Sequence, residues 1–285
     1  MQLQAFAKIN LDLRVLGRRD DGYHEVRTIL QTIDWADEIR IEPSDRFEFI
    51  ENGIHAGGEN LVVKAVRAFE KQTGQAVLAR MELFKNVPAG AGLGGGSADA
   101  AVTFLGLQKM FCKQIPESEL LKTLSGLGSD VPFFAFGGRA KGTGRGNEIH
   151  PMDDDADYGI VVVVPKTQIA TREAYSWLTV PDKSNSISRF AARPDSSPEA
   201  EPGNDFECVV FPRHPLLNEI KTEILRAGAL RASLSGTGSA LFGIFGSREE
   251  AEAAAPHLAS WGIAKAARPL SRPEYLQRIW GVAKW

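Results

Sequence analysis

The segment Pro88–Ser97, which reads PAGAGLGGGS, constrains the fold of this chain more than any other part of it. Five of its residues are glycine, and glycine is entropically costly to order unless the backbone needs a special conformation or a close approach. The segment lies between a predicted strand, Met81–Val87, and a predicted helix, Ser97–Met110. Such a turn points backbone N–H groups and the positive end of a helix at an anion. We therefore interpret this segment as a phosphate-binding loop and call it the glycine loop.

Other interpretations of the glycine loop fit less well. A merely flexible connection rarely needs five glycines around one leucine. Gly90, Gly92 and Gly95 satisfy the dinucleotide spacing GxGxxG, but no strand with a terminal acidic residue follows the helix at the required distance. A Walker A loop needs Lys-Ser or Lys-Thr after the last glycine, and this chain has Ser97 there. At the start of the predicted helix, the Ser97 hydroxyl is placed to cap the helix, contact phosphate or reach a metal ion.

Composition excludes several classes of protein. The formal net charge of −3 argues against nucleic acid as the main partner, because proteins that bind a phosphate backbone carry a basic excess. Cys112 and Cys208 are far apart, so we expect neither a disulfide framework nor a structural zinc site. The stretch Met1–Lys8 lacks the pattern of a secretory signal, and no apolar run approaches the ~20 residues of a membrane span. We expect a cytoplasmic protein with no membrane partner.

The first half of the chain mixes strands and helices. Alternating apolar residues predict a first strand between Leu3 and Leu13. Asn60, a residue typical of the N-cap, and Gly74, a typical helix terminator, bracket a predicted helix. The other predicted elements of this half are short strands at 39–41 and 47–49 and helices at 116–127 and from 129 onward.

The second half of the chain has its own order of elements. The order is strand, helix, strand, strand, helix, strand, which is the ferredoxin-like arrangement. We therefore expect an α+β fold in two domains, 1–150 with the glycine loop and 151–285 ferredoxin-like, with a boundary near the polar run Met152–Asp157. Pro181–Pro202, rich in Ser, Pro and Asp, predicts a mobile surface excursion. The six elements are expected at 158–164, 215–226, 230–234, 240–245, 249–259 and 263–267.

Three motifs in order, Ala7–Leu11 (AKINL), Pro88–Ala101 and Leu234–Gly243 (LSGTGSALFG), resemble those of the GHMP kinase superfamily. Members of that superfamily phosphorylate small alcohols, so the resemblance implies ATP and Mg²⁺ as cofactors. Further segments are similar to the branch of the superfamily whose substrate carries a cytidine diphosphate, and this similarity covers nearly the whole chain. The segments that carry it are AKINL, Arg18–Glu25, Gly128–Phe133 and Asn204–Glu207.

The resemblance implies catalytic roles for Lys8 and Asp130. Taken alone, Asp130 would be the N-cap of a helix and Lys8 a solvated residue on a strand. The resemblance instead matches Asp130 to the catalytic base of the family. It matches Lys8 to the active-site lysine, which would hold Asp130 ionised and offset charge on the transferring phosphoryl group. Asn10 should project from the same strand face as Lys8.

Nucleotide contacts are expected mainly from the glycine loop. Ala98 stands where many relatives carry a second serine, so the resemblance implies no metal-holding hydroxyl at that position, and the metal ligands stay unassigned. Three residues outside the loop are weaker candidates for nucleotide contacts. The two lysines among them are equally typical of a solvated surface. The assigned residues are Pro88, Ala89, Gly90, Ala91, Gly92, Leu93, Gly94, Gly95, Gly96, Ser97 and Ala98, with Asn60, Lys64 and Lys85 as the weaker set.

The resemblance also implies a substrate site. It assigns His24 to the edge of the cytosine, where a ring that donates and accepts hydrogen bonds is useful. An aromatic ring should stack on the cytosine, and Tyr175 is our choice, although it is equally typical of core packing on a helix. The segment Ser235–Ser239, here the second glycine turn, is either a tight hairpin turn or a support for the diphosphate. The assigned residues are Asn10, Tyr23, His24, Thr171, Tyr175, Gly236, Thr237 and Gly238.

Two alternative functions stay open at this point. One is another kinase of the superfamily that acts on homoserine or a mevalonate-like alcohol, which has no cytosine for Tyr175 to stack on. The other is a nucleotide-binding module without catalysis, which would need neither Lys8 nor Asp130. An RNA-binding role is disfavoured by the acidic charge balance. We expect a monomer or a weak homodimer.

Overall fold

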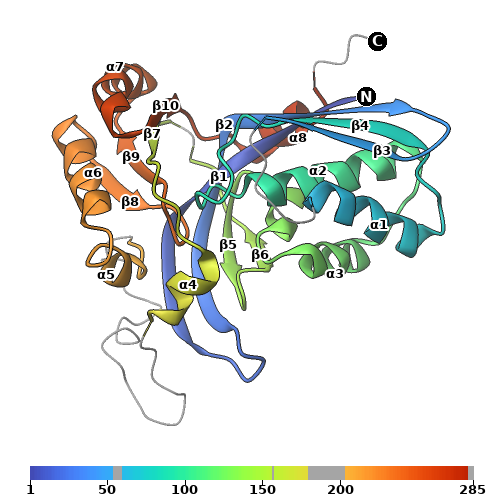
Figure 1. Ribbon diagram of the computed structural model, residues 1–285, viewed down its shortest axis with the longest axis horizontal. Helices are drawn as coiled ribbons and strands as arrows, with labels where there is room; N and C mark the ends of the chain where they lie inside the picture. Colours follow the sequence, from blue (N-terminus) through green and yellow to red (C-terminus); the bar gives the residue numbers. More distant parts are fainter. Residues whose placement is uncertain (54–59, 156, 179–202, 282–285) are drawn as a thin grey trace.

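The computed structural model describes residues 1–53, 60–155, 157–178 and 203–281, and its larger sheet is built on a long antiparallel ribbon (Figure 1). The ribbon consists of β1 (Gln2–Arg18) and β2 (His24–Pro43), drawn in blue. Apart from β1, which pairs with β2, the strands lie in the order β3-β4-β2-β5-β6. The shorter strands are β3 (Glu48–Asn52), β4 (Ala79–Phe84), β5 (Arg139–Thr143) and β6 (Glu148–Pro151).

Helices cover one face of this sheet and enclose the first apolar core (Figure 1). They begin with α1, whose capping residues were predicted. Asn60 Oδ1 accepts a hydrogen bond of 2.8 Å from the Val62 amide, and Gly74 closes the helix with a left-handed φ of 66°. Their bounds are α1 (Leu61–Thr73), α2 (Gly95–Met110), α3 (Glu117–Leu127) and the 3₁₀ turn η1 (Val131–Ala135).

The second sheet is antiparallel throughout, in the order β10-β7-β9-β8, with α6 and α7 packed against it. This order confirms the ferredoxin-like arrangement and the α+β fold class. Two short helices, α4 (Thr171–Ser176) and α5 (Glu207–Val210), precede α6. The other elements are β7 (Gly159–Val164), α6 (Pro215–Arg226), β8 (Arg231–Leu234), β9 (Leu241–Phe245), α7 (Arg248–Leu258), η2 (Ala259–Trp261) and β10 (Ile263–Ala267).

The β1–β2 ribbon contributes to the apolar cores of both halves. Leu3 and Phe6 lie in the first core, whereas Leu13, Val15 and Val26 lie in the second core with residues of α6 and α7. The last helix, α8 (Arg272–Arg278), returns to the first core. A domain boundary near residue 150 stays a prediction, with α8 packed against the half that precedes it.

The structure differs from the expectation most in β2. The sequence indicated only a short strand at 39–41, whereas β2 begins at His24 and includes the polar residues Thr28, Gln31 and Thr32. All three are buried, and their side chains donate hydrogen bonds to backbone carbonyls. The expected third helix after Ser129 is only the turn η1. The strands β5 and β6 and the helices α5 and α8 were not predicted, and Pro181–Pro202 lies outside the described residues.

Candidate active site

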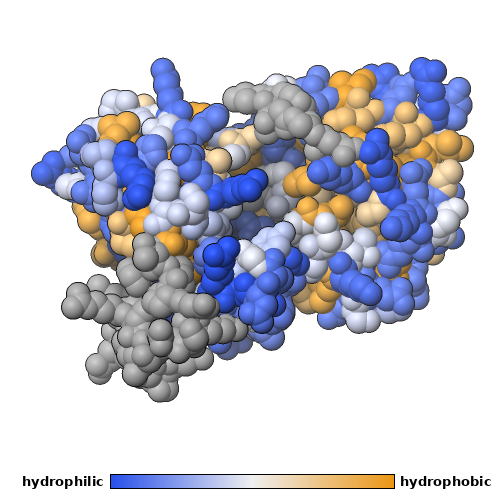
Figure 2. All heavy atoms as spheres, turned by 60° about the horizontal axis from the view of Figure 1, so that its bottom comes forward, coloured by the Kyte–Doolittle hydropathy of each residue, from blue (hydrophilic) through white to orange (hydrophobic). Residues whose placement is uncertain are grey.

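A cavity of about 1080 Å³ opens where the β1–β2 ribbon meets the glycine loop, α4 and the second glycine turn. In the space-filling view the molecule is hollowed between its two halves (Figure 2). Most of the residues predicted for catalysis and substrate binding line this cavity. They are Lys8, Asn10, Tyr23, His24, Asp130, Thr171, Tyr175, Gly236 and Thr237, joined by Gly92 and Ser97 of the glycine loop.

Lys8 is the most deeply placed charged residue of the cavity wall. Its Nζ lies 3.1 Å from Asp130 Oδ2 and donates a hydrogen bond of 2.6 Å to Asn10 Oδ1. The Asn10 amide in turn donates to Thr28 Oγ1 at 2.8 Å, which fixes the orientation of Asn10. Lys8 is buried because the glycine loop lies over it: a Cβ on Gly94 would be 2.9 Å from Lys8 Cγ.

Asp130 precedes η1 and its side chain is 37% exposed toward the cavity. It makes no capping hydrogen bond to η1, so the N-cap role favoured by the isolated sequence does not apply. The carboxylate faces the Lys8 ammonium instead. A carboxylate in this position is a proton acceptor within reach of a substrate in the cavity.

The glycine loop is held by the second glycine turn. Gly90, Gly92 and Gly94 have positive φ values of 70°, 84° and 69°. A Cβ on Gly92 would lie 2.1 Å from the Ser235 carbonyl oxygen, and Ser235 Oγ donates to the Gly92 carbonyl at 3.0 Å. Only glycine at position 92 permits this approach.

The N-terminus of α2 is open to an anion. The helix begins at Gly95, and its N-cap is Gly94, which has no side chain to bind the first amides. Ser97, expected at the helix start, is the third residue of the helix and lines the cavity. Unpaired amides and the helix dipole together favour a phosphate group at this point.

Lys85 lies beneath the loop rather than in the cavity wall. Its ammonium is buried and pairs with Asp37 and, at 2.8 Å, with Asp99. Burial raises the pKa of Asp99, and the neighbouring Asp37 carboxylate adds to the rise, although the Lys85 charge opposes it. Burial also lowers the pKa of Lys85, but the two carboxylates outweigh this and raise it. A Cβ on Gly95 would lie 3.3 Å from Lys85 Nζ, so this cluster supports the start of α2.

The other weaker nucleotide candidates also lie outside the cavity lining. Asn60 caps α1, and Lys64 is an exposed residue of the same helix. Gly238, predicted to bind the substrate, does not line the cavity, unlike its neighbours Gly236 and Thr237, and has a φ of 89°. Nucleotide contacts from Asn60 and Lys64 and a substrate contact from Gly238 stay predictions.

An aromatic wall forms the far side of the cavity. The rings of His24 and Tyr175 lie 4.9 Å apart at an interplanar angle of 31°, and Tyr175 packs edge-on against Phe206 at 4.8 Å. Burial, with a smaller contribution from the Arg18 charge, lowers the pKa of His24. Burial and the Asp130 charge raise the pKa of Tyr175 to about 12. Tyr175 packs against the second core and also lines the cavity, and its stacking on a cytosine stays a prediction.

The sequence did not single out Arg145, which lines the cavity on the turn between β5 and β6. Its guanidinium carbon lies 4.5 Å from the ring centroid of Tyr23, as in a cation–π contact. The turn is tied to β2, because the Val26 amide donates to the Gly144 carbonyl at 2.8 Å. Its neighbours Gly144 and Gly146 indicate a turn, but nothing in the local sequence indicates that the arginine meets Tyr23. Arg18, Thr28, Ser129 and Arg172 also line the cavity and were not assigned.

The described parts of the chain contain no group of three or more His, Cys, Asp or Glu residues that would hold a metal ion. Mg²⁺ is compatible with this finding if the ion binds together with a nucleotide, because Mg²⁺ on phosphates needs just one or two protein ligands. Ser97 and Asp130 are residues of the cavity lining whose side-chain oxygens would hold such an ion. Within residues 1–53, 60–155, 157–178 and 203–281, no helix has the length and apolar run that crossing a bilayer requires.

Two family models match the chain. The GHMP kinases N terminal domain matches residues 60–138, and the GHMP kinases C terminal domain matches residues 195–264. Among curated relatives, 4-diphosphocytidyl-2-C-methyl-D-erythritol kinase of Solibacter usitatus is 44% identical over 86% of this chain and 81% of its own length. The protein of that name from Chlorobium chlorochromatii is 38% identical over 89% of this chain and 91% of its own length.

Solved structures give the same result. A crystal structure of 4-(cytidine 5'-diphospho)-2C-methyl-D-erythritol kinase is 34% identical, with a TM-score of 0.80, and the match covers 94% of this chain and 99% of that chain. Homoserine kinase from Cytophaga hutchinsonii matches with a TM-score of 0.66 over 96% of each chain, but at 16% identity. That second likeness is one of fold alone.

Proposed function

This chain belongs to the GHMP kinase family, and on that basis we propose that it transfers the γ-phosphoryl group of ATP to the 2-hydroxyl of 4-diphosphocytidyl-2-C-methyl-D-erythritol. The observation that carries the proposal is the Lys8–Asp130 pair in the cavity beside the glycine loop. A module that only binds nucleotide has no need of such a pair. The identity of the proposed alcohol comes from the names of the relatives, and the aromatic wall is consistent with a substrate that carries a base.

In the proposed reaction Asp130 acts on the attacking hydroxyl. As the oxygen of the alcohol forms its bond to the γ-phosphorus, the bond from that phosphorus to the β,γ-bridging oxygen breaks and ADP leaves. The proton of the hydroxyl passes to the Asp130 carboxylate, which is the exposed partner of the ion pair. Lys8 offsets the negative charge that gathers on the transferring group.

The glycine loop would position the triphosphate. Phosphoryl transfer demands mainly alignment and charge neutralisation from a protein, and the open amides at the start of α2 provide both. Mg²⁺, when bound with the nucleotide, supplies further neutralisation of the phosphate oxygens. Asn10 keeps the Lys8 ammonium directed into the cavity through its 2.6 Å hydrogen bond.

The cytidine would lie against the aromatic wall. Tyr23 is 53% exposed, and His24 and Tyr175 stand with their rings close together beside it. An aromatic surface favours a stacked base, and the lowered pKa keeps His24 neutral near pH 7, able to donate one hydrogen bond and accept another. Arg145, which lies over the Tyr23 ring, adds a cation to the cavity lining. The proposed setting is the cytoplasm, with the protein acting as a monomer or weak homodimer on a small molecule and not on nucleic acid.

The test is an assay of purified protein with Mg²⁺-ATP and 4-diphosphocytidyl-2-C-methyl-D-erythritol. ADP release and the phosphorylated product are both followed, and homoserine, mevalonate and galactose are offered in parallel. We expect turnover of the cytidylyl substrate alone. ADP release only with another alcohol would keep the family and overturn the substrate, and ATP binding without any turnover would favour the non-catalytic module.

A further inference from the structure

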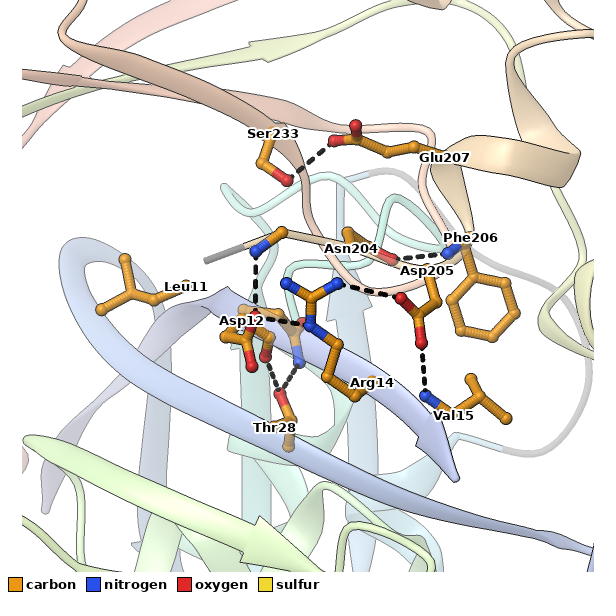
Figure 3. A network of polar contacts seen from close by, with 12 residues as sticks. Leu11, Asp12, Arg14, Val15, Thr28, Asn204, Asp205, Phe206, Glu207 and Ser233 are labelled. Carbon is orange, nitrogen blue, oxygen red and sulfur yellow. Dashed lines mark hydrogen bonds and ion pairs between the residues drawn. The ribbon is translucent and has the colours of Figure 1, made fainter. Parts of the chain in front are cut away.

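The segment Gly203–Glu207 binds to β1 around Leu13, next to the wall of the cavity (Figure 3). The Gly203 amide donates to Asp12 Oδ1 at 2.9 Å, and the Val15 amide donates to Asp205 Oδ2 at 2.9 Å. Arg14 Nη1 donates to Asp205 Oδ1 at 3.1 Å. These contacts fix the segment to the strand that carries Lys8 and Asn10.

Asn204, the second residue of this segment, forms hydrogen bonds with both the nitrogen and the oxygen of its carboxamide. Its Nδ2 donates to the carbonyl oxygens of Leu234 at 2.8 Å and Gly236 at 2.7 Å. Its Oδ1 accepts a hydrogen bond of 2.9 Å from the Phe206 amide. Asn204 is only 6% exposed, so water does not replace these bonds at low cost.

The two carbonyls bound by Asn204 flank Ser235, at the start of the second glycine turn. The other side of this turn contacts the glycine loop, where Ser235 Oγ donates to the Gly92 carbonyl at 3.0 Å. Gly236 and Thr237, the next two residues, line the cavity. The carboxamide of Asn204 therefore holds the turn from behind at the point where the glycine loop meets the substrate cavity.

We propose that Asn204 is a positioning residue for phosphoryl transfer, which fixes the second glycine turn relative to β1 and so sets where Gly236 and Thr237 meet the acceptor substrate. The proposal rests on the proposed function for its kinetic consequence, but its structural part is independent of which alcohol is used. The two N–H groups of the Asn204 carboxamide bind two carbonyls, so they fix both the position and the orientation of the turn relative to β1. Their loss frees the turn without removing any group that touches the cavity.

The decisive variant is Asn204→Asp, which keeps the acceptor for the Phe206 amide and removes both donors. A matched control exists in Gln31, which is 1% exposed and donates to the Thr32 and Leu270 carbonyls at 3.0 and 2.9 Å. Gln31 pairs with Ile9 in the sheet, so its side chain lies on the face away from Lys8 and Asn10. Gln31→Glu therefore makes the same chemical change at a buried site outside the cavity lining. Asn204→Ala and Gln31→Ala form a second, uncharged pair for use if a buried carboxylate prevents folding.

Three measurements are made on each variant: kcat/KM for the cytidylyl alcohol, Kd for ATP, and amide hydrogen exchange of residues 234–240. For the Asn204 variants we expect a kcat/KM lower by about 10²-fold, the effect of a misplacement near 1 Å. We also expect a Kd for ATP within about twofold of the parent and faster exchange of 234–240. The Gln31 variants should lose comparable thermal stability with unchanged kcat/KM and unchanged exchange of 234–240.

Equal kcat/KM in the Asn204 and Gln31 variants, or exchange of 234–240 that does not change, would overturn the positioning role. A parent protein that leaves the cytidylyl alcohol unphosphorylated would instead contradict the proposed function. In that case the exchange comparison alone decides on Asn204.

Discussion

Lys8 and Asp130 form an ion pair of 3.1 Å in which one side chain is 3% exposed and the other 37%. This difference in exposure indicates different roles for the two charged groups. The ammonium is held in one place by burial and by Asn10, whereas the carboxylate can meet a substrate in the cavity. A base must be accessible to its substrate, and the position of Asp130 in the cavity wall provides this access.

Replacement of Asp130 by Asn removes the proton acceptor and keeps the shape of the side chain. We expect kcat to fall by about 10²–10⁴-fold, the usual contribution of a general base, with KM for the alcohol and Kd for ATP within about threefold of the parent. The measurement is steady-state kinetics with direct ATP titration. Asp34→Asn, at an ion pair with Arg268 outside the cavity lining, is the control and should retain kcat. A parental kcat in Asp130→Asn would exclude this residue as the base.

Replacement of Gly92 by Ala should be far more harmful than replacement of Gly90. Both glycines have positive φ, which costs a residue with a Cβ roughly 1–2 kcal/mol. Only Gly92 also has a neighbour, because its Cβ would lie 2.1 Å from the Ser235 carbonyl oxygen, whereas Gly90 has nothing within 4 Å. We expect Gly92→Ala to lose about 1–3 kcal/mol more stability than Gly90→Ala in urea unfolding, and to weaken ATP binding as well. Equal losses of stability in the two variants would mean that the second glycine turn moves away from the new Cβ at little cost.

Replacement of Asp99 by Asn should flatten the dependence of stability on pH. Burial raises the pKa of Asp99 from 3.8 to about 8, so between these values the folded chain holds a proton that the unfolded chain has released. The free energy of unfolding therefore falls as pH rises through this window. Asp99→Asn lacks this contribution, and we expect it to gain stability relative to the parent between pH 5 and pH 8. Urea unfolding at both pH values is the measurement, and parallel changes in the two proteins would contradict the prediction.

Replacement of Tyr175 by Leu removes the aromatic surface proposed to face the cytosine. We expect KM for the cytidylyl alcohol to rise about tenfold, since base stacking on an aromatic ring is worth about 1–3 kcal/mol. Kd for ATP should stay unchanged. Tyr175→Phe keeps the ring, so it is the matched control and should show a KM within about twofold of the parent. A tenfold rise in both variants would assign the effect to the hydroxyl.

Local patterns were sufficient for much of the fold. The bounds of α6 and β10 agree with the prediction, because Pro215 starts the helix and a short apolar run forms the strand. The glycine loop was identified correctly as a strand-to-helix turn, since five glycines have few other uses. The length of β2 could not be read in this way, because its buried polar residues are satisfied by partners far along the chain, such as Leu270.

The site shows the same division. Lys8, Asn10 and Asp130 were assigned from the resemblance, and the structure brings their side chains into one cluster. Lys85 was only a weaker candidate for a nucleotide contact, with a solvated surface position as the alternative. Its pairing with Asp37 and Asp99 depends on long-range packing that no local pattern contains. Arg145 was missed for a related reason, as only the hairpin β5–β6 brings it to Tyr23.

The β1–β2 ribbon makes the two halves of the molecule a single unit on melting. Leu13, Val15 and Val26 fill the second core, while Leu3 and Phe6 of the same ribbon fill the first. Unfolding of either core therefore exposes apolar side chains of the other. Heating should give one cooperative unfolding transition rather than two. The ion pair on Lys8 stands on the shared ribbon, so the chemistry is lost in the same step as the fold.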